Sequence, residues 1–165
     1  MDFWADYFMS LHYLLDGYNV LKQMEAFRDL PLEDGRHGLL KWIGDSRPQG
    51  SVNNQVTVVF DGAQGSDSLY GEIRVIFSDG CSADDKIKRM VEEDAGRKNC
   101  VVVSDDKDIF LYARSLGAKI MSVAAFTSKP GGLHTRQDDG GKYIPLSRQE
   151  KINKELRFFW LKEKQ

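Results

Sequence analysis

The stretch Leu14-Leu15-Asp16-Gly17 is an apolar run that ends on a carboxylate, and this pattern occurs three times along the chain. The two further runs are Val58-Val59-Phe60-Asp61-Gly62 and Val101-Val102-Val103-Ser104-Asp105-Asp106. Apolar runs separated by helical stretches are typical of strands that are buried on both faces of a parallel sheet. The sequence therefore predicts an α/β fold, a three-layer sandwich around a mostly parallel central sheet.

The spacing of apolar residues also predicts where the other elements lie. We expect strands at residues 11–16, 56–60, 73–77, 100–104 and 119–123, and helices at 22–30, 33–43, 83–95 and 106–116. Ser82 is a plausible N-cap of the third helix, and Gly117 suits the end of the fourth. Residues 11–126 are predicted to form one domain that follows an N-terminal extension at 1–10. A flexible loop at 127–146 and a basic, aromatic helix at 147–165, packed on the same domain, are expected to complete the chain.

The charge of the chain is unevenly distributed. Residues 129–165 hold 9 Lys and Arg against 5 Asp and Glu (net +4), whereas residues 1–128 hold 14 against 20 (net −6). An acidic body with a basic tail suits a metal-dependent enzyme that acts on a polyanion, although a solvated basic helix explains the tail equally well. The start of the chain lacks the positive region of a secretory signal, and no apolar run approaches the roughly 18 residues that span a bilayer. We expect a cytoplasmic protein without a membrane partner.

The acidic residues follow the predicted strands at one edge of the sheet. Ligands of parallel sheets bind beyond the carboxyl ends of the strands, and Asp16, Asp61 and Asp105 fall there. A fourth cluster, Ser82-Ala83-Asp84-Asp85, opens a helix. Each motif alone is explained by a capped turn or by the dipole at a helix start. Carboxylates from four motifs at one edge, however, would repel one another unless a cation balances their charge. Oxygen ligands of this kind indicate Mg²⁺ or Mn²⁺.

Other kinds of site find little support. Cys81 and Cys100 have no neighbouring His or Cys at zinc-site spacing, so we predict no zinc site. His12, His37 and His134 lie in no catalytic motif, and the sequence has neither a Walker motif nor a G-x-G-x-x-G fingerprint. A haloacid-dehalogenase-type phosphatase needs a second Asp two residues after the first, and a receiver domain needs a Lys that closes its last strand; the chain has neither.

Four motifs together resemble a known family. They are Asp16-Gly17-Tyr18-Asn19-Val20, then Val59-Phe60-Asp61-Gly62, then Phe77-Ser78 with Ser82-Ala83-Asp84-Asp85-Lys86-Ile87, and finally Val103-Ser104-Asp105. Their order and spacing, over about residues 11–126, resemble the YacP-like branch of the NYN domain family. NYN domains are similar to PIN domains, which are metal-dependent ribonucleases with an α/β fold.

The resemblance implies a role for each matching residue. Asp16, Asp84 and Asp105 match the catalytic, metal-binding carboxylates of the family. Matches to supporting positions are Asn19, Asp61, Asp85 and Ser104, of which Asp61 is also a candidate metal ligand. The chain departs from the family pattern in the extension before Leu11 and in its extra acids. These acids are Asp106 and Asp108, and they leave open which carboxylate is the last metal ligand.

The activity that the resemblance implies is hydrolysis of RNA phosphodiester bonds with Mg²⁺ or Mn²⁺ as the cofactor. We expect an endoribonuclease, although the sequence leaves open an exonuclease mode and whether one or two metal ions bind. RNA binding beside an acidic site requires basic residues, and the candidates nearest the site or in the tail are Lys86, Lys107, Arg136 and Lys142. The alternative is a non-catalytic RNA-binding or interaction module that retains the fold. The sequence leaves open whether the chain forms a homo-oligomer or has a partner in the translation machinery.

Overall fold

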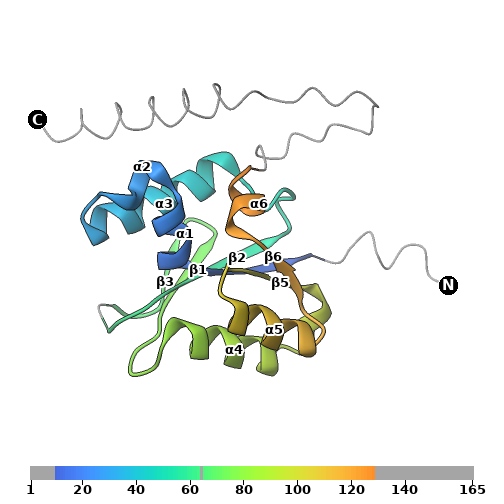
Figure 1. The fold of residues 1–165 in the computed structure, drawn as a ribbon. Coiled ribbons are helices and arrows are strands. Elements are labelled where there is room, and N and C mark those ends of the chain that lie inside the picture. Colours follow the sequence, from blue (N-terminus) through green and yellow to red (C-terminus); the bar gives the residue numbers. More distant parts are fainter. Residues whose placement is uncertain (1–9, 64, 129–165) are drawn as a thin grey trace, which may run out of the picture.

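A single mixed sheet forms the centre of the molecule. The computed structural model describes residues 10–63 and 65–128, and in them six strands lie in the order β3-β4-β2-β1-β5-β6 (Figure 1). The strands are β1 (His12–Asp16), β2 (Gln55–Phe60), β3 (Ser68–Tyr70), β4 (Ile73–Phe77), β5 (Cys100–Val103) and β6 (Lys119–Met121). Five are mutually parallel, and the edge strand β3 pairs antiparallel with β4.

Helices cover both faces of this sheet. They are α1 (Gly17–Gln23), α2 (Glu25–Arg28), α3 (Leu32–Ser46), α4 (Ala83–Glu93), α5 (Lys107–Ser115) and α6 (Val123–Ser128), and a 3-10 turn η1 (Arg97–Asn99) precedes β5. Helices α1, α2, α3 and α6 lie on one face, and α4 and α5 on the other (Figure 1). This arrangement confirms the predicted three-layer α/β architecture. None of the helices in the described part of the chain is long and apolar enough to cross a bilayer.

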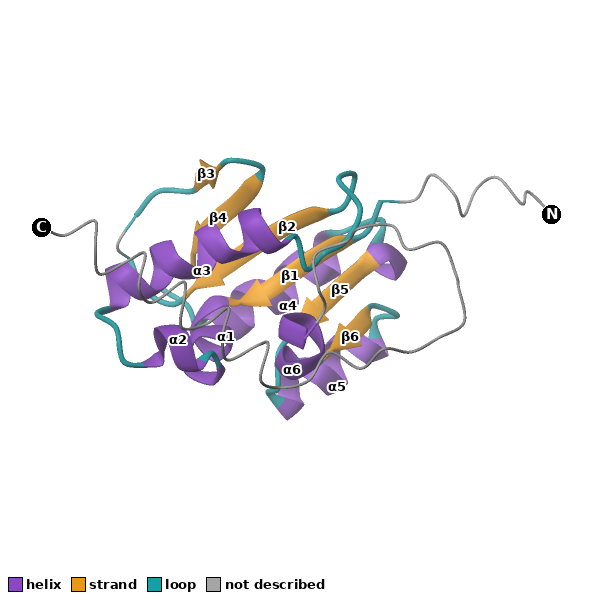
Figure 2. Cartoon of the chain, turned by 90° about the horizontal axis from the view of Figure 1, so that it is seen from above, coloured by secondary structure: helices purple, strands orange, loops and turns teal. Residues whose placement is uncertain are grey.

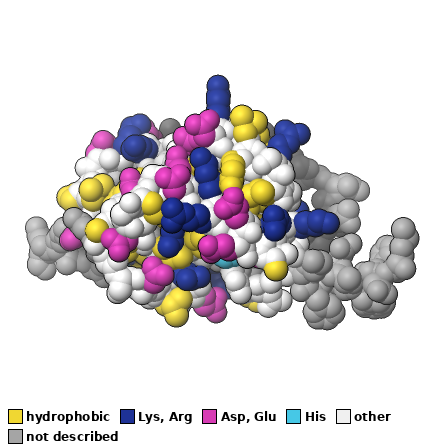
Figure 3. All heavy atoms as spheres, turned by 90° about the horizontal axis from the view of Figure 1, so that it is seen from below, with side chains coloured by type: hydrophobic (Ala, Val, Ile, Leu, Met, Phe, Trp, Pro, Cys, Tyr) yellow, Lys and Arg dark blue, Asp and Glu magenta, His cyan; other side chains and the backbone are white. Residues whose placement is uncertain are grey.

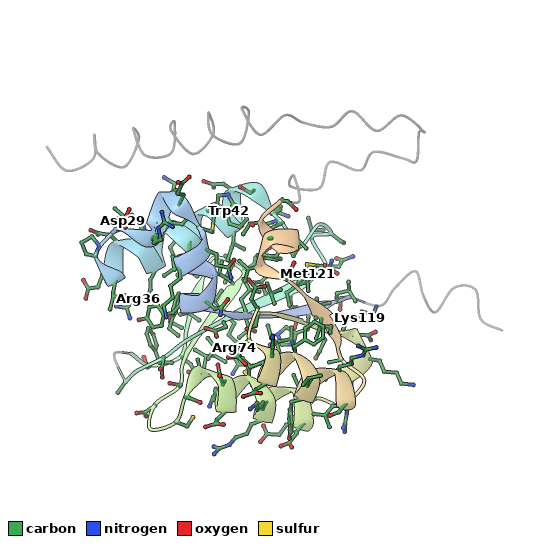
Figure 4. All side chains as sticks on the ribbon, in the orientation of Figure 1. Asp29, Arg36, Trp42, Arg74, Lys119 and Met121 are labelled. Carbon is green, nitrogen blue, oxygen red and sulfur yellow. The ribbon has the colours of Figure 1, made fainter. Side chains whose placement is uncertain are left out.

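Two separate apolar layers explain why the strands are apolar throughout. Successive strand residues point to opposite faces, so Leu15 contributes to the layer under α1–α3 and Leu14 to the layer over α4 and α5. Trp42 of α3 belongs to the first layer, and Met121 of β6 packs against it (Figure 4). Both Leu14 and Leu15 are at most 1% exposed, as expected for a sheet that is covered on both sides.

The structure corrects the predicted elements in three places. The sequence predicts a helix from residue 22, but α1 begins at Gly17, directly after β1, because the carboxylate of Asp16 accepts a hydrogen bond from the N–H of Asn19 and caps it. The helical stretch is interrupted at Met24, whose backbone is extended. Strand β3 and helix α6 were not predicted, and Thr127 and Ser128 belong to α6 rather than to a loop. Residues 1–9 of the predicted extension, residues 129–146 of the loop and the helix at 147–165 lie outside the described residues.

The parallel strands end together on one side of the molecule. Seen from above, the arrowheads of β1, β2, β4 and β5 point the same way, towards the side where α1 and α2 lie (Figure 2). The register pairs Asp16 at the end of β1 with Val59 near the end of β2, and Leu15 with Val103 at the end of β5. The residues that follow these strands therefore meet at one edge, as the sequence predicts.

Candidate active site

A cleft of about 590 Å³ opens at this edge. Helices α1, α2 and the starts of α3 and α4 surround it. Four carboxylates line it, each from a different strand–helix or strand–loop junction: Asp16, Asp61, Asp84 and Asp106. The clustering of acidic residues predicted from the sequence is thus present in the fold.

Asp16 is the most buried of these carboxylates. It is the last residue of β1 and the N-cap of α1, and its side chain is 8% exposed. One oxygen accepts the N–H of Asn19 at 3.3 Å. Burial, together with the nearby charges of Asp84 and Asp106, raises the pKa of Asp16 to about 6, and the hydrogen bond from Asn19 opposes this rise. The ionised carboxylate of Asp16 is therefore unfavourable in the metal-free protein, and a bound cation would offset this cost.

Asp84 lies in the first turn of α4. Ser82 caps this helix as predicted, since its hydroxyl oxygen accepts the N–H of Asp85 at 3.1 Å. Burial raises the pKa of Asp84, followed in importance by the charge of Asp106. Asp85 is exposed and is not part of the cleft lining, in keeping with adjacent helical residues pointing in different directions.

Asp61 is held in place by Ser78, a residue of the Phe77-Ser78 motif for which the sequence predicts no role of its own. The hydroxyl of Ser78, at the end of β4, donates to Asp61 Oδ1 at 2.9 Å and accepts the N–H of Gly62 at 3.1 Å. Ser78 itself is 2% exposed, whereas Asp61 is exposed, so the pair of bonds ties an exposed carboxylate to a buried side chain. Ser78 therefore orients the carboxylate that follows β2 towards the cleft.

The adjacent residues Asp105 and Asp106 point to different surroundings. Asp106 lines the cleft, caps α5 by accepting the N–H groups of Asp108 and Ile109, and donates its own N–H to Ser104 Oγ at 3.1 Å. Asp105 instead accepts the N–H of Val123, at the start of α6, at 3.0 Å, and it also contacts the side-chain amide of Gln23. Asp105 is not part of the cleft lining, and neither is the exposed Asp108.

The basic residues that line the cleft differ from those predicted from the sequence. Lys22 and Arg28 line the cleft, whereas Lys86 and Lys107 do not. Arg136 and Lys142 lie outside the described residues. On the face formed by α4 and α5, Lys and Arg side chains alternate with Asp and Glu (Figure 3). This face therefore presents no continuous basic path, and Lys22 and Arg28 are the better candidates for contacts with an anionic substrate.

The rest of the cleft is apolar. Tyr18, Leu21 and Phe27 line it beside the two basic residues, and so do Leu30 and Leu32. Leu32 is 62% exposed and Leu30 37% exposed, which is unusual for large apolar side chains that lie next to each other in one cleft. The cleft thus combines an acidic end, an apolar shelf (Leu30 and Leu32) and the basic side chains of Lys22 and Arg28.

The donor set of the acidic end fits a hard divalent cation. Its potential ligands are carboxylate oxygens, the class that Mg²⁺ and Mn²⁺ prefer. The raised pKa values of Asp16 and Asp84 come from burial and from neighbouring carboxylates, so a positive charge between them would offset both effects. Lys22 lowers the pKa of Asp16 only as a minor opposing influence.

A sheet of this topology with acidic residues gathered at its carboxyl edge defines a PIN-like α/β domain of the nuclease type. More specifically, the chain belongs to the YacP-like NYN domain family, whose model matches residues 13–157. This confirms the resemblance seen in the sequence motifs. Members of this family are generally ribonucleases.

Solved structures support the assignment of the fold. Rae1 (YacP) from Bacillus subtilis is 18% identical, with a TM-score of 0.59, and the match covers 94% of this chain and 84% of that chain. A single-substitution variant of Rae1 is 23% identical over 72% of this chain and 73% of that chain, with a TM-score of 0.58. At these identities the likeness concerns the fold alone. Comparison with curated protein sequences gives no significant match.

Proposed function

We propose that this protein is a metal-dependent ribonuclease that cleaves RNA internally, with Mg²⁺ or Mn²⁺ as its cofactor. The observation that carries the proposal is the convergence of Asp16, Asp61, Asp84 and Asp106 on one cleft, where burial raises the pKa of Asp16 to about 6. Membership in a family of nuclease-like domains supports the same reaction class.

The four cleft carboxylates would hold the cation. A bound divalent ion supplies positive charge for the scissile phosphate and makes a bound water more acidic. The chain positions two of these carboxylates through hydrogen bonds: Ser78 donates to Asp61, and Ser104 accepts the backbone N–H of Asp106. In this proposal Asp105 is a positioning residue, because its carboxylate ties the start of α6 to the β5–α5 turn.

The remainder of the cleft suits an unpaired RNA strand. Lys22 and Arg28 would contact phosphate oxygens, and a guanidinium does so with two parallel hydrogen bonds. The apolar shelf of Leu30 and Leu32 would receive a base that is not stacked in a duplex. The proposed substrate is therefore single-stranded RNA.

A matched pair of substitutions tests the carboxylate assignment. Asp106→Asn removes a charge but keeps a capping side chain, so we expect cleavage in Mg²⁺ or Mn²⁺ to fall at least about 100-fold with little change in melting temperature. Asp105→Asn should leave much more activity and lower the melting temperature instead. A closed circular RNA as the substrate establishes whether cleavage is internal.

The opposite pattern, with Asp105→Asn inactive and Asp106→Asn active, would show that Asp105 is the last ligand, as the family motif implies. If the unaltered chain binds RNA but does not cleave it in either metal, the protein is a binding module and the proposal is wrong.

A further inference from the structure

A second group of potential ligands lies at the opposite edge of the sheet, where the strands begin. His12 and Cys100 are the first residues of β1 and β5 and are directly paired in the parallel register. Asp94, at the end of α4, lies beside them. One ligand atom from each of the three residues lies within 4.8 Å of the other two. Strand register, rather than spacing along the chain, brings them together, which is why the sequence predicted no zinc site.

We infer that His12, Asp94 and Cys100 form a binding site for a borderline-soft divalent cation, with Zn²⁺ as the best fit. The thiol sulfur is 3.0 Å from Asp94 Oδ2, and His12 Nδ1 is 3.7 Å from the same oxygen. Tetrahedral zinc with bonds of about 2.0–2.3 Å separates its ligand atoms by about 3.3–3.8 Å. The three donors therefore need only small shifts to surround one ion.

Hydrogen bonds to the far side of two ligands orient them for this role. His12 Nε2 lies 2.8 Å from Thr57 Oγ1, a neighbour on β2, and Asp94 Oδ1 accepts the N–H of Gly96 at 2.7 Å. The 3.7 Å between His12 Nδ1 and Asp94 Oδ2 is longer than an ordinary hydrogen bond, and when Nε2 is the donor to Thr57 the lone pair of Nδ1 is available to a metal ion. Outer hydrogen bonds of this kind are typical of histidine and carboxylate ligands of metals.

The chemistry of the donors favours zinc over the hard cations of the cleft. A thiolate and an imidazole suit Zn²⁺ and similar ions, whereas Mg²⁺ prefers oxygen alone. A role for Cys100 as a reactive thiol is disfavoured, since the residue is 0% exposed and burial raises the pKa of its thiol to about 12. On binding, the S–H bond is replaced by a sulfur–metal bond and the proton passes to solvent. The side chains of His12 and Asp94 are 22% and 31% exposed, so water has access to a fourth ligand position.

Cobalt spectroscopy on the full chain tests the site without reference to RNA cleavage. After treatment with a chelator, Co²⁺ is titrated in the presence of excess Mg²⁺, which competes for the carboxylate cleft. A thiolate ligand gives a near-ultraviolet charge-transfer band, and we expect one that Zn²⁺ abolishes by displacing the cobalt. The band should persist in Cys81→Ser, a matched control at the only other cysteine, and be absent in Cys100→Ser.

Two further variants keep the test decisive if Cys100→Ser does not fold. His12→Gln and Asp94→Asn alter the partly exposed ligands, and each should weaken Co²⁺ binding at least about tenfold. The absence of the band from the folded unaltered chain, or its loss in Cys81→Ser, would overturn the proposal. A band that survives in Cys100→Ser would overturn it as well. The three residues would then only link α4, β1 and β5 through the Cys100–Asp94 hydrogen bond and the His12–Asp94 ion pair, and the proposed ribonuclease activity would be unaffected.

Discussion

Asp16 combines two roles that act against each other in the metal-free protein. As an N-cap it stabilises α1, because its carboxylate satisfies the N–H of Asn19. As an 8% exposed carboxylate near Asp84 and Asp106 it destabilises the fold whenever it is ionised. Replacement by Asn separates the two roles, since an asparagine side chain caps a helix equally well without the charge.

The first prediction concerns the pH dependence that follows. The pKa of Asp16 is raised from 3.8 to about 6 in the folded chain, so the folded state binds the proton more tightly than the unfolded state. Without metal, the free energy of unfolding should therefore decrease as pH rises from about 4 to about 6, by up to about 3 kcal/mol from this residue. Asp16→Asn should lack this decrease and melt a few degrees higher at pH 7.5 in chelator.

Thermal melts of both proteins at several pH values, with and without chelator, measure this effect. A large drop in the melting temperature of Asp16→Asn would mean that the carboxylate is structural. Added Mn²⁺ should stabilise the unaltered chain more than the variant, because only a bound state with the full ligand set offsets the burial of the charge.

At the residue scale, the sequence predicted the clustering but not the direction of each side chain. Asp16, Asp61 and Asp84 follow strands or open a helix in ways that motifs reveal, and all three line the cleft. Asp105 and Asp106 are neighbours whose side chains diverge at the β5–α5 turn, and only the three-dimensional turn decides which one lines the cleft. Lys22 and Arg28 were missed because the basic candidates were selected by closeness in sequence. The metal-binding roles themselves stay predictions.

Among the elements, the junction between β1 and α1 most restricts which residue can occupy a position, because it leaves little room for a side chain directly after the strand. The helix starts at the residue after the strand, and this brings the backbone of Gly17 against β2. A Cβ atom at position 17 would lie 2.4 Å from Cε1 of Phe60 and 3.0 Å from Cγ1 of Val58. Phe60 is fully buried, so it has little room to move away.

The second prediction compares two glycine substitutions. Gly17→Ala should lower the free energy of unfolding by about 1–3 kcal/mol because it overpacks the core beside Phe60. Gly44→Ala is the matched control: it lies in α3, its new Cβ would meet nothing within 4 Å, and it should stabilise the protein by about 0.5–1 kcal/mol. Chemical denaturation of both variants gives the two values, and equal destabilisation would contradict the packing argument.

Long elements were predicted better than short ones. The central strands and α3, α4 and α5 follow from apolar periodicity, and their boundaries differ from the structure by a few residues. Strand β3 has three residues and is formed by pairing with β4, so its own sequence holds little signal. Helix α6 has six residues and depends on capping by Ser122 and on the hydrogen bond from Val123 to Asp105, which no local pattern reveals.

For the molecule as a whole, charge separates an acidic domain from a basic C-terminal region. The net charge is −6 for residues 1–128 and +4 for residues 129–165. RNA would have to approach the acidic cleft through local cations, and its affinity would depend on salt according to the number of phosphates that these cations neutralise.

The third prediction distinguishes the two groups of cations. The double substitution Lys22→Gln with Arg28→Gln should reduce the slope of log affinity for RNA against log salt concentration by about 0.7 for each phosphate that is no longer neutralised. It should also lower kcat, since both residues line the cleft. Arg136→Gln with Lys142→Gln should reduce the salt dependence but change cleavage of saturating RNA much less. Binding and single-turnover rates measured from low to moderate salt test both pairs. If the cleft pair leaves salt dependence and rate unchanged, the RNA follows another path.

Strand β1 carries His12 at one end and Asp16 at the other. Four residue steps of a strand span about 13 Å, and pairing on both sides with β2 and β5 keeps this length fixed. Strand β1 therefore fixes the distance between His12 at one edge of the sheet and Asp16 at the other. The unpaired electrons of Mn²⁺ in the cleft would lie close enough to broaden the magnetic resonance signals of the His12 ring, whereas diamagnetic Mg²⁺ would leave them sharp. The extent of that broadening reports the distance between the ion and the His12 ring.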